Sequence, residues 1–223
     1  MKPKLSEPLA LQYAGENLFL FAEKALFWAR RKTLIIADPH FGKAAAFRAL
    51  GIAVPEGTLN QDLQRLGLLL EASESERLVI LGDFFHAKAG KSVSTLQSIR
   101  GWRNKFSHLE VLLITGNHDR HAGKPPRAWD FTPIAEPWQD GPFMYSHEPQ
   151  YIHGFHVLCG HIHPCISLRN KIGGGMRVPC FSFTEERVIL PAFGNFCGMA
   201  NIEPQPKEKI FAIGPNEVIP IKR

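Results

Sequence analysis

The hexapeptide Leu81-Gly82-Asp83-Phe84-Phe85-His86 places a carboxylate and an imidazole directly after a short apolar run, Leu78–Leu81. A short apolar run that ends at glycine is typical of a buried strand. Gly82 allows the backbone to come close to whatever Asp83 holds, because glycine lacks a Cβ atom. The segment therefore predicts a buried strand that ends in a ligand-binding turn.

Four other segments repeat this arrangement of an apolar run followed by polar side chains. The polar residues that follow the runs lie at 38–40, 116–119, 147 and 160–163. If the strands belong to one layered sheet structure, their ends gather at one edge. The metal-ligating side chains that would gather there are Asp38, His40, Asp83, Asn117, His147, His161 and His163. Such a mixture of oxygen and imidazole ligands suits Mn, Fe or Zn better than calcium.

Residues 33–117 alternate between strand and helix patterns. Strands are expected at 33–37, 77–82 and 110–115, and helices at 43–50, near 58–70 and at 92–106. In the middle helix, leucines spaced by three and four residues predict one buried face, and Thr58 with Gln61 has the pattern of a capping box. Strands that alternate with helices favour a parallel sheet covered by those helices, with ligands beyond the carboxyl ends of the strands.

The two ends of the chain have only short strand patterns. Residues 9–36 predict short strands with a hairpin-like turn at Gly15-Glu16-Asn17. Beyond Pro125, proline and glycine become frequent and helical periodicity disappears, which predicts a second, largely antiparallel sheet. Its strand candidates are 142–146, 155–159, 165–168, 176–183, 186–190 and 208–220. We expect the C-terminal strands to pair with the N-terminal ones or to pack on the first sheet. Because the ligand set comes from both halves, we expect one domain over residues 1–223.

The composition is that of an ordinary globular protein with a small excess of basic residues. The 223 residues carry a formal charge of +5, which suits a polyanionic partner. Four cysteines without a C-x-x-C pair argue against a zinc ribbon or a redox motif and fit free thiols in a reducing compartment. The N-terminus lacks the apolar segment of a signal peptide, and no apolar run has the length of a membrane span. We therefore expect a cytoplasmic protein without a membrane segment.

In their order, the polar segments resemble the motifs of the calcineurin-like metallophosphoesterases. The matching blocks are Asp38-Pro39-His40, Gly82 to His86, Gly116 to Asp119, His147 and Gly160 to His163. The resemblance implies an α/β fold of two packed mixed sheets flanked by helices. It also implies two divalent metal ions, with manganese the first expectation and iron or zinc as alternatives.

Further segments are similar to the bacterial ligase-associated DNA damage response endonucleases, the PdeM group. They include Ala37-Asp38-Pro39-His40-Phe41-Gly42-Lys43 and Leu190-Pro191-Ala192-Phe193-Gly194. This resemblance implies phosphodiester hydrolysis on nucleic acid in DNA repair, by in-line attack of a metal-bound hydroxide. It also implies a DNA ligase or a helicase as a repair partner.

The resemblance to the wider family assigns roles to individual residues. One metal would be held by Asp38, His40, Asp83 and His163. The other would be held by Asp83, Asn117, His147 and His161, with Asp83 bridging. Three further residues have expected catalytic roles. His118 would contact the phosphate or assist the leaving group, Asp119 would fix the tautomer of His118, and His86 would favour diester substrates.

Two alternatives to a nuclease remain at this stage. The first is a phosphodiesterase or phosphomonoesterase for small molecules, and the second is a non-catalytic scaffold with this fold. Lys43, Arg48 and the basic segment 120–127 are candidates for phosphate contacts. For Arg48 a solvated helix face is the preferred interpretation.

Overall fold

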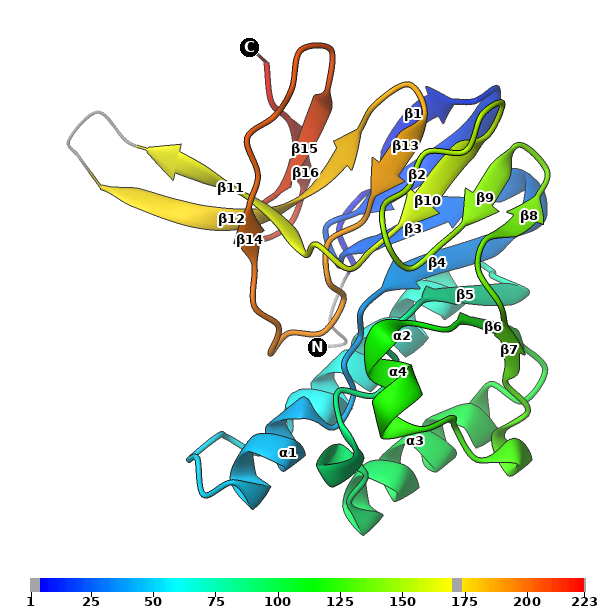
Figure 1. Cartoon of the computed structure of the whole chain (residues 1–223), viewed down its shortest axis with the longest axis vertical. Coiled ribbons are helices and arrows are strands. Elements are labelled where there is room, and N and C mark those ends of the chain that lie inside the picture. The colour runs from blue at the N-terminus through cyan, green and yellow to red at the C-terminus, as the bar shows by residue number, and fades with distance from the viewer. Residues whose placement is uncertain (1–4, 170–173, 223) are drawn as a thin grey trace.

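Three of the apolar runs that precede the polar motifs form the central strands of a seven-stranded sheet (Figure 1), and the runs before His147 and Gly160 belong to a second sheet. The computed structural model describes residues 5–169 and 174–222. In spatial order the strands of this sheet are β1 (Leu9–Tyr13), β2 (Glu16–Phe21), β3 (Ala25–Trp28), β4 (Thr33–Ala37), β5 (Arg77–Leu81), β6 (Glu110–Ile114) and β7 (Thr132–Ile134). Pairing is antiparallel from β1 to β4 and parallel from β4 to β7.

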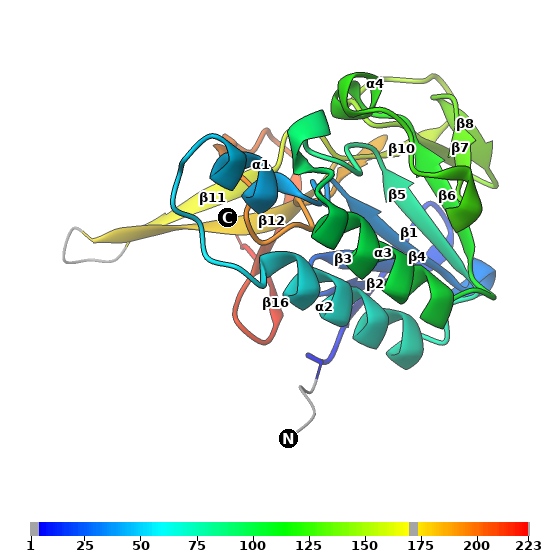
Figure 2. The same cartoon turned by 90° about the horizontal axis from the view of Figure 1, so that it is seen from below.

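The described chain contains four α-helices, which lie in the connections between or after the strands of this sheet. They are α1 (Lys43–Ala49), α2 (Thr58–Ala72), α3 (Val93–Lys105) and α4 (Asn117–Ala122). Figure 2 shows α2 and α3 side by side across one face of the sheet. The connections also contain short 3₁₀ turns at Ala29–Arg31, Lys88–Gly90 and Arg127–Trp129.

The second sheet covers the opposite face of the first. Its main path runs β14 (Ala200–Asn201), β11 (Pro164–Arg169), β12 (Gly175–Phe183), β13 (Arg187–Ile189), β10 (His156–Cys159), β9 (Phe143–Tyr145) and β8 (Trp138–Asp140). Two C-terminal strands, β15 (Lys209–Ile213) and β16 (Val218–Pro220), extend it from β12. The two packed mixed sheets with flanking helices confirm the predicted fold class.

After their first residue the central strands β4, β5 and β6 are apolar, because both of their faces are buried. Along β4 to β6, alternate residues such as Ile36 and Ile80 pack against the helices, in a cluster that includes Leu66 of α2. The residues between them, such as Ile35 and Val79, pack against the second sheet. The first sheet therefore lies between two hydrophobic cores. Packing on both faces holds the ends of its central strands in fixed positions.

The register brings the strand ends to one edge. Ala37, Leu81 and Ile114 end their strands and are aligned across β4, β5 and β6. Ala37 also forms a bridge with Ala192, which follows β13 of the second sheet. The polar motifs that follow these strands therefore lie close together, as the sequence predicted.

Several details differ from the expectations. Five of the eight strand pairs described in the second sheet are antiparallel, as predicted, but β10 runs parallel to both β9 and β13, and β11 runs parallel to β14. Residues 146–155 provide the crossover that the parallel pair of β9 and β10 needs. Of the two arrangements expected for the C-terminal strands, pairing with the N-terminal strands is not formed, because β15 pairs with β12 and β16 pairs with β15. Packing on the first sheet is found, since Ile213 and Val218 share a core cluster with Ile35 and Val79.

Two local predictions were also inaccurate. The first hairpin turns at Ala14-Gly15, and Glu16 already belongs to β2. Thr58 is the first residue of α2 rather than its cap, since Gly57 occupies the cap position without a side-chain hydrogen bond. No helix in the described part of the chain is both long and apolar enough to span a bilayer.

Candidate metal centre

The loops after the strand ends bring two groups of candidate ligand side chains to one site. Asp38, His40, Asp83 and His147 are buried, whereas His163 is half-buried and His161 is exposed. The site therefore has a closed floor of carboxylates and imidazoles and an open side toward solvent.

The first group contains Asp38, His40 and His163. The Nε2 atoms of His40 and His163 are 3.3 Å apart, and Nε2 of His163 is 3.7 Å from Oδ1 of Asp38. Oδ1 of Asp38 is buried without a hydrogen-bond partner in the described structure. A buried carboxylate oxygen without a donor is costly, and a cation would satisfy it.

The second group contains Asp83, Asn117, His147 and His161. Nε2 of His147 is 2.8 Å from Oδ1 of Asn117, 3.0 Å from Nδ1 of His161 and 3.6 Å from Oδ1 of Asp83. Asp83 faces both groups, because its Oδ2 lies 3.7 Å from Nε2 of His40. One carboxylate is therefore positioned between the two ligand groups.

Backbone carbonyl groups fix the tautomers of two ligand rings. Nδ1 of His147 lies 3.1 Å from the carbonyl oxygen of Leu81, and Nδ1 of His163 lies 3.0 Å from that of Gly198. A carbonyl can only accept, so both Nδ1 atoms carry the proton and both Nε2 atoms present lone pairs. These lone pairs face carboxylate and amide oxygens, which are also acceptors. A convergence of acceptors with few donors fits divalent cations in both groups.

The pKa values of His40 and His86 favour the neutral form of these two imidazoles, whereas the pKa of His163 is raised, because burial, which lowers it, is outweighed by Asp38. Burial, followed by the neighbouring His163, lowers the pKa of His40 to about 2. Burial, followed by Lys43, lowers the pKa of His86 to about 4. Protons therefore compete weakly with a cation for these nitrogens near neutral pH.

The backbone of the ligand loops is strained. Five ligand residues have positive φ angles, namely Asp38 (50°), His40 (45°), Asp83 (50°), His161 (68°) and His163 (53°). Residues other than glycine rarely adopt this conformation, and such strain concentrates at functional sites.

Glycines make room between the ligand blocks. A Cβ atom on Gly82 would lie closer than 3.0 Å to the His147 ring, and one on Gly116 or Gly160 would come equally close to Asp83 or Asp38. These glycines are required because another ligand occupies the space of the missing side chain.

His118 stands beside the ligand groups. Its Nδ1 is 2.6 Å from the carbonyl oxygen of His86, and its Nε2 is 4.0 Å from Oδ2 of Asp83. The His86 ring stacks on the His118 ring with centroids 5.1 Å apart. The geometry leaves Nε2 of His118 directed toward the site.

Asp119 has a different position from the one expected. Its buried carboxylate accepts hydrogen bonds from the backbone N–H groups of Gly116 (3.0 Å) and Phe85 (3.3 Å). Burial raises its pKa to about 6. The tautomer of His118 is instead fixed by the carbonyl of His86. Asp119 holds the backbone of the loop that carries His118 and makes no hydrogen bond to the His118 ring in the described structure.

The basic candidates lie outside the ligand groups. Lys43 and Arg48 line a neighbouring cavity, and Arg48 donates to the carbonyl groups of Val54 and Pro55. In the segment 120–127, Arg120 pairs with Glu136 at 3.8 Å. Glu136 was not predicted as a site residue, yet it accepts from the backbone N–H of His147 at 2.6 Å.

Comparison with known proteins agrees with this geometry. Residues 31–187 match the family model described as calcineurin-like phosphoesterase. The crystal structure of Pseudomonas putida nuclease MPE is 39% identical, with a TM-score of 0.86 over 96% of this chain and 100% of the nuclease. YfcE, a phosphoesterase from E. coli, is 15% identical with a TM-score of 0.41 over 84% of this chain and 96% of its own. No curated protein sequence matches this chain significantly.

The family match spans the strand ends and the loops that carry the ligand groups. The chain therefore belongs to the calcineurin-like phosphoesterase family and is a metal-dependent phosphoesterase.

Proposed function

We propose that this protein hydrolyses phosphodiester bonds in nucleic acid, with DNA as the substrate, and that it uses two divalent metal ions. The observation that carries the proposal is the position of Asp83 between two ligand groups. Its Oδ2 faces His40, and its Oδ1 faces His147. A carboxylate with one oxygen toward each group is suited to bridge two cations.

The ligand assignment follows from the two groups. Asp38, His40 and His163 would hold one cation, and Asn117, His147 and His161 the other, with Asp83 shared. When bound, such cations neutralise phosphate charge and acidify a coordinated water. We propose manganese because the ligands mix oxygen and imidazole, a set that suits several first-row metals.

The chain's own groups would position the substrate and move a proton. His118 is held by the His86 carbonyl through Nδ1, so its Nε2 is free to contact a phosphate oxygen or to protonate the leaving oxygen once it has acquired a proton. The His86 ring supports it from one side. We assign His118 as the catalytic acid, His86 as a positioning residue, and Asp119 to the loop that carries His118.

Three observations support nucleic acid as the substrate class. The nuclease that shares 39% identity covers nearly the whole chain, and the formal charge of +5 favours a polyanion. The sequence resemblance to repair endonucleases adds a DNA repair role, with a ligase or helicase partner, in the cytoplasm.

An activity panel with metal-loaded protein tests the proposal. We expect hydrolysis of labelled DNA and of a chromogenic diester in manganese, little hydrolysis of a chromogenic monoester, and no activity after chelation with metal loss confirmed by elemental analysis. Asp83→Asn should lose both metals, whereas Asp130→Asn, at an exposed carboxylate, serves as the control. Preference for the monoester, or full activity of metal-free protein, would contradict the proposal.

A further inference from the structure

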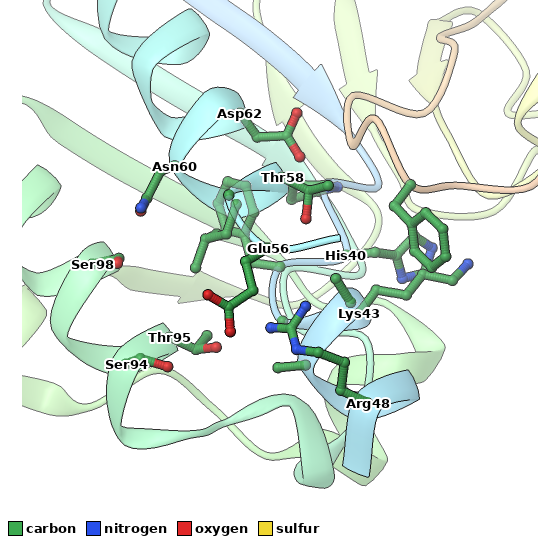
Figure 3. Close-up of a pocket in the computed structure, with 18 of the residues that line it drawn as sticks. His40, Lys43, Arg48, Glu56, Thr58, Asn60, Asp62, Ser94, Thr95 and Ser98 are labelled. Carbon is green, nitrogen blue, oxygen red and sulfur yellow. The ribbon is translucent and has the colours of Figure 1, made fainter. Parts of the chain in front are cut away.

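A cavity of about 210 Å³ lies next to the metal centre, between α1 and the N-terminal ends of α2 and α3. Figure 3 shows His40, Lys43 and Arg48 on one side of this cavity and Asn60, Ser94 and Ser98 on the other. His40 belongs both to the cavity wall and to the first ligand group. The cavity and the metal centre are therefore adjacent and share one residue.

A row of aromatic rings joins the cavity to the catalytic histidine. Phe196 lines the cavity, is 38% exposed, and packs edge-to-face on Phe47 with centroids 5.5 Å apart. Phe47 in turn lies 6.0 Å from the His86 ring, which stacks on His118. Phe196 is therefore an exposed aromatic side chain in the cavity lining, and its contact with Phe47 limits the orientation of its ring.

The loop that carries Phe196 is fixed on both sides of this residue. The Asn195 N–H donates to the Asp62 carboxylate at 3.3 Å, and the Cys197 thiol donates to the Asp38 carbonyl at 3.7 Å. The next residue, Gly198, provides the carbonyl that orients the ring of His163. Phe196 is therefore held in place by the same segment that supports the metal centre.

The lining of the cavity contains charges of both signs. It includes Lys43, Arg48 and Glu56, and it also includes Asp62, whose carboxylate is paired with Arg65. Together with the neutral polar side chains of Asn60 and Ser98, these groups suit a molecule with both donors and acceptors on its edges. The volume is below the roughly 300–1,000 Å³ of sites for drug-sized ligands, so the cavity suits a single small ring system.

We propose that this cavity binds the base of the nucleotide next to the scissile phosphodiester, with Phe196 as the stacking surface. The polar lining offers both acceptors and donors to the edge of the base, among them Glu56, Asn60 and Ser98. This inference rests on the proposed function, since it assumes a phosphodiester at the metal centre. It adds a subsite that recognises a nucleoside rather than phosphate alone.

The test compares two diesters that share a leaving group and differ in the base. Thymidine 5′-(p-nitrophenyl phosphate) carries a nucleoside with its base. Methyl p-nitrophenyl phosphate has a methyl group in that place, so its nitrophenyl leaving group is its only ring. We expect Phe196→Ala to lower kcat/KM for the thymidine ester by about 5- to 150-fold, the range for loss of one base–aromatic stack, and to affect the methyl ester much less. Phe196→Leu, which keeps apolar bulk, should fall between. Ile219→Ala, at a similarly exposed apolar residue on β16, should leave both substrates unchanged.

Binding provides a second readout that needs no turnover. Calorimetric titration of thymidine 5′-monophosphate into manganese-loaded protein should show weaker binding to Phe196→Ala than to the wild type. Equal losses on both esters, or equal nucleotide binding by the two proteins, would overturn the inference. If the thymidine ester and the nucleotide respond to Phe196→Ala but DNA is not cleaved by the wild type, the base subsite stands and the nucleic-acid substrate is wrong. If the wild type cleaves DNA but Phe196→Ala changes neither the hydrolysis of the thymidine ester nor the binding of the nucleotide, the proposed function stands and the base subsite is wrong.

Discussion

Gly82→Ala tests whether the site geometry depends on the close approach of two ligand loops. Gly82 has φ of +81°, and an added Cβ would lie closer than 3.0 Å to three atoms of His147. The His147 ring has little freedom to move away, because its Nδ1 donates to the Leu81 carbonyl. Gly154 is a matched control, since its φ is +80° and nothing lies within 4 Å of an added Cβ.

Both substitutions place a Cβ atom on a left-handed backbone, but only Gly82→Ala also overlaps with a neighbouring side chain. Placing alanine at a left-handed position costs about 1–2 kcal/mol of unfolding free energy in both variants. The steric overlap with His147 adds about 1–3 kcal/mol in Gly82→Ala alone. We therefore expect Gly82→Ala to lose about 2–5 kcal/mol and Gly154→Ala about 1–2 kcal/mol.

Denaturant titration of the metal-free proteins measures this difference, because the midpoint shifts with stability at constant slope. Displacement of His147 should also lower the manganese content of Gly82→Ala after reloading, while Gly154→Ala binds metal normally. Equal destabilisation of the two variants with an intact metal content would refute the reasoning, since it would leave no role for the contact with His147.

The remaining predictions concern catalysis, metal affinity and a helix. His118→Ala should keep its metal and lose about 10²- to 10⁴-fold in rate, with a larger loss for a DNA alkoxide than for nitrophenolate, which needs no proton; loss of metal from this variant would contradict its assignment as an acid. His163→Ala should instead bind metal more weakly and regain activity at high manganese, as elemental analysis and a metal titration would show. Gly101→Ala, in the interior of α3 with open space around an added Cβ, should stabilise the protein by about 0.5–1 kcal/mol in the same denaturant assay.

The sequence was sufficient to predict the central strands and the proximity of the candidate ligand residues because both signals are local. Each block of these residues directly follows an apolar run. Because Ala37, Leu81 and Ile114 are aligned at the ends of neighbouring strands, the blocks that follow them lie close together in the fold. The short strands β7, β8 and β14 were missed because none of them contains an apolar run, whereas the equally short β9 and β13 are apolar and were predicted. The parallel pairing of β10 was missed because hydrophobic patterns do not specify strand direction.

The supporting atoms of the site had no sequence signal. The tautomers of His118 and His163 are set by the carbonyl groups of His86 and Gly198. Because every residue has a backbone carbonyl group, the sequence does not indicate which one will accept a hydrogen bond from a given ring. The nearby carboxylate of Asp119 was the natural candidate from the sequence, yet its hydrogen bonds go to backbone N–H groups. The role of Phe196 likewise depends on a loop whose position is known only from the fold.

The ligand blocks also support one another in a way that explains how their strained backbone persists. The Asp38 carboxylate accepts from the N–H of His161 at 2.7 Å, and the Asp83 carboxylate accepts from the N–H of His118 at 2.9 Å. Each carboxylate that would bind a metal thus also holds the backbone of a different block. Left-handed conformations at Asp38, Asp83 and His161 cost free energy individually, and these hydrogen bonds offset part of it only when all the blocks are in place. The site is therefore a cooperative unit, and loss of one carboxylate would loosen a second loop as well as remove a ligand.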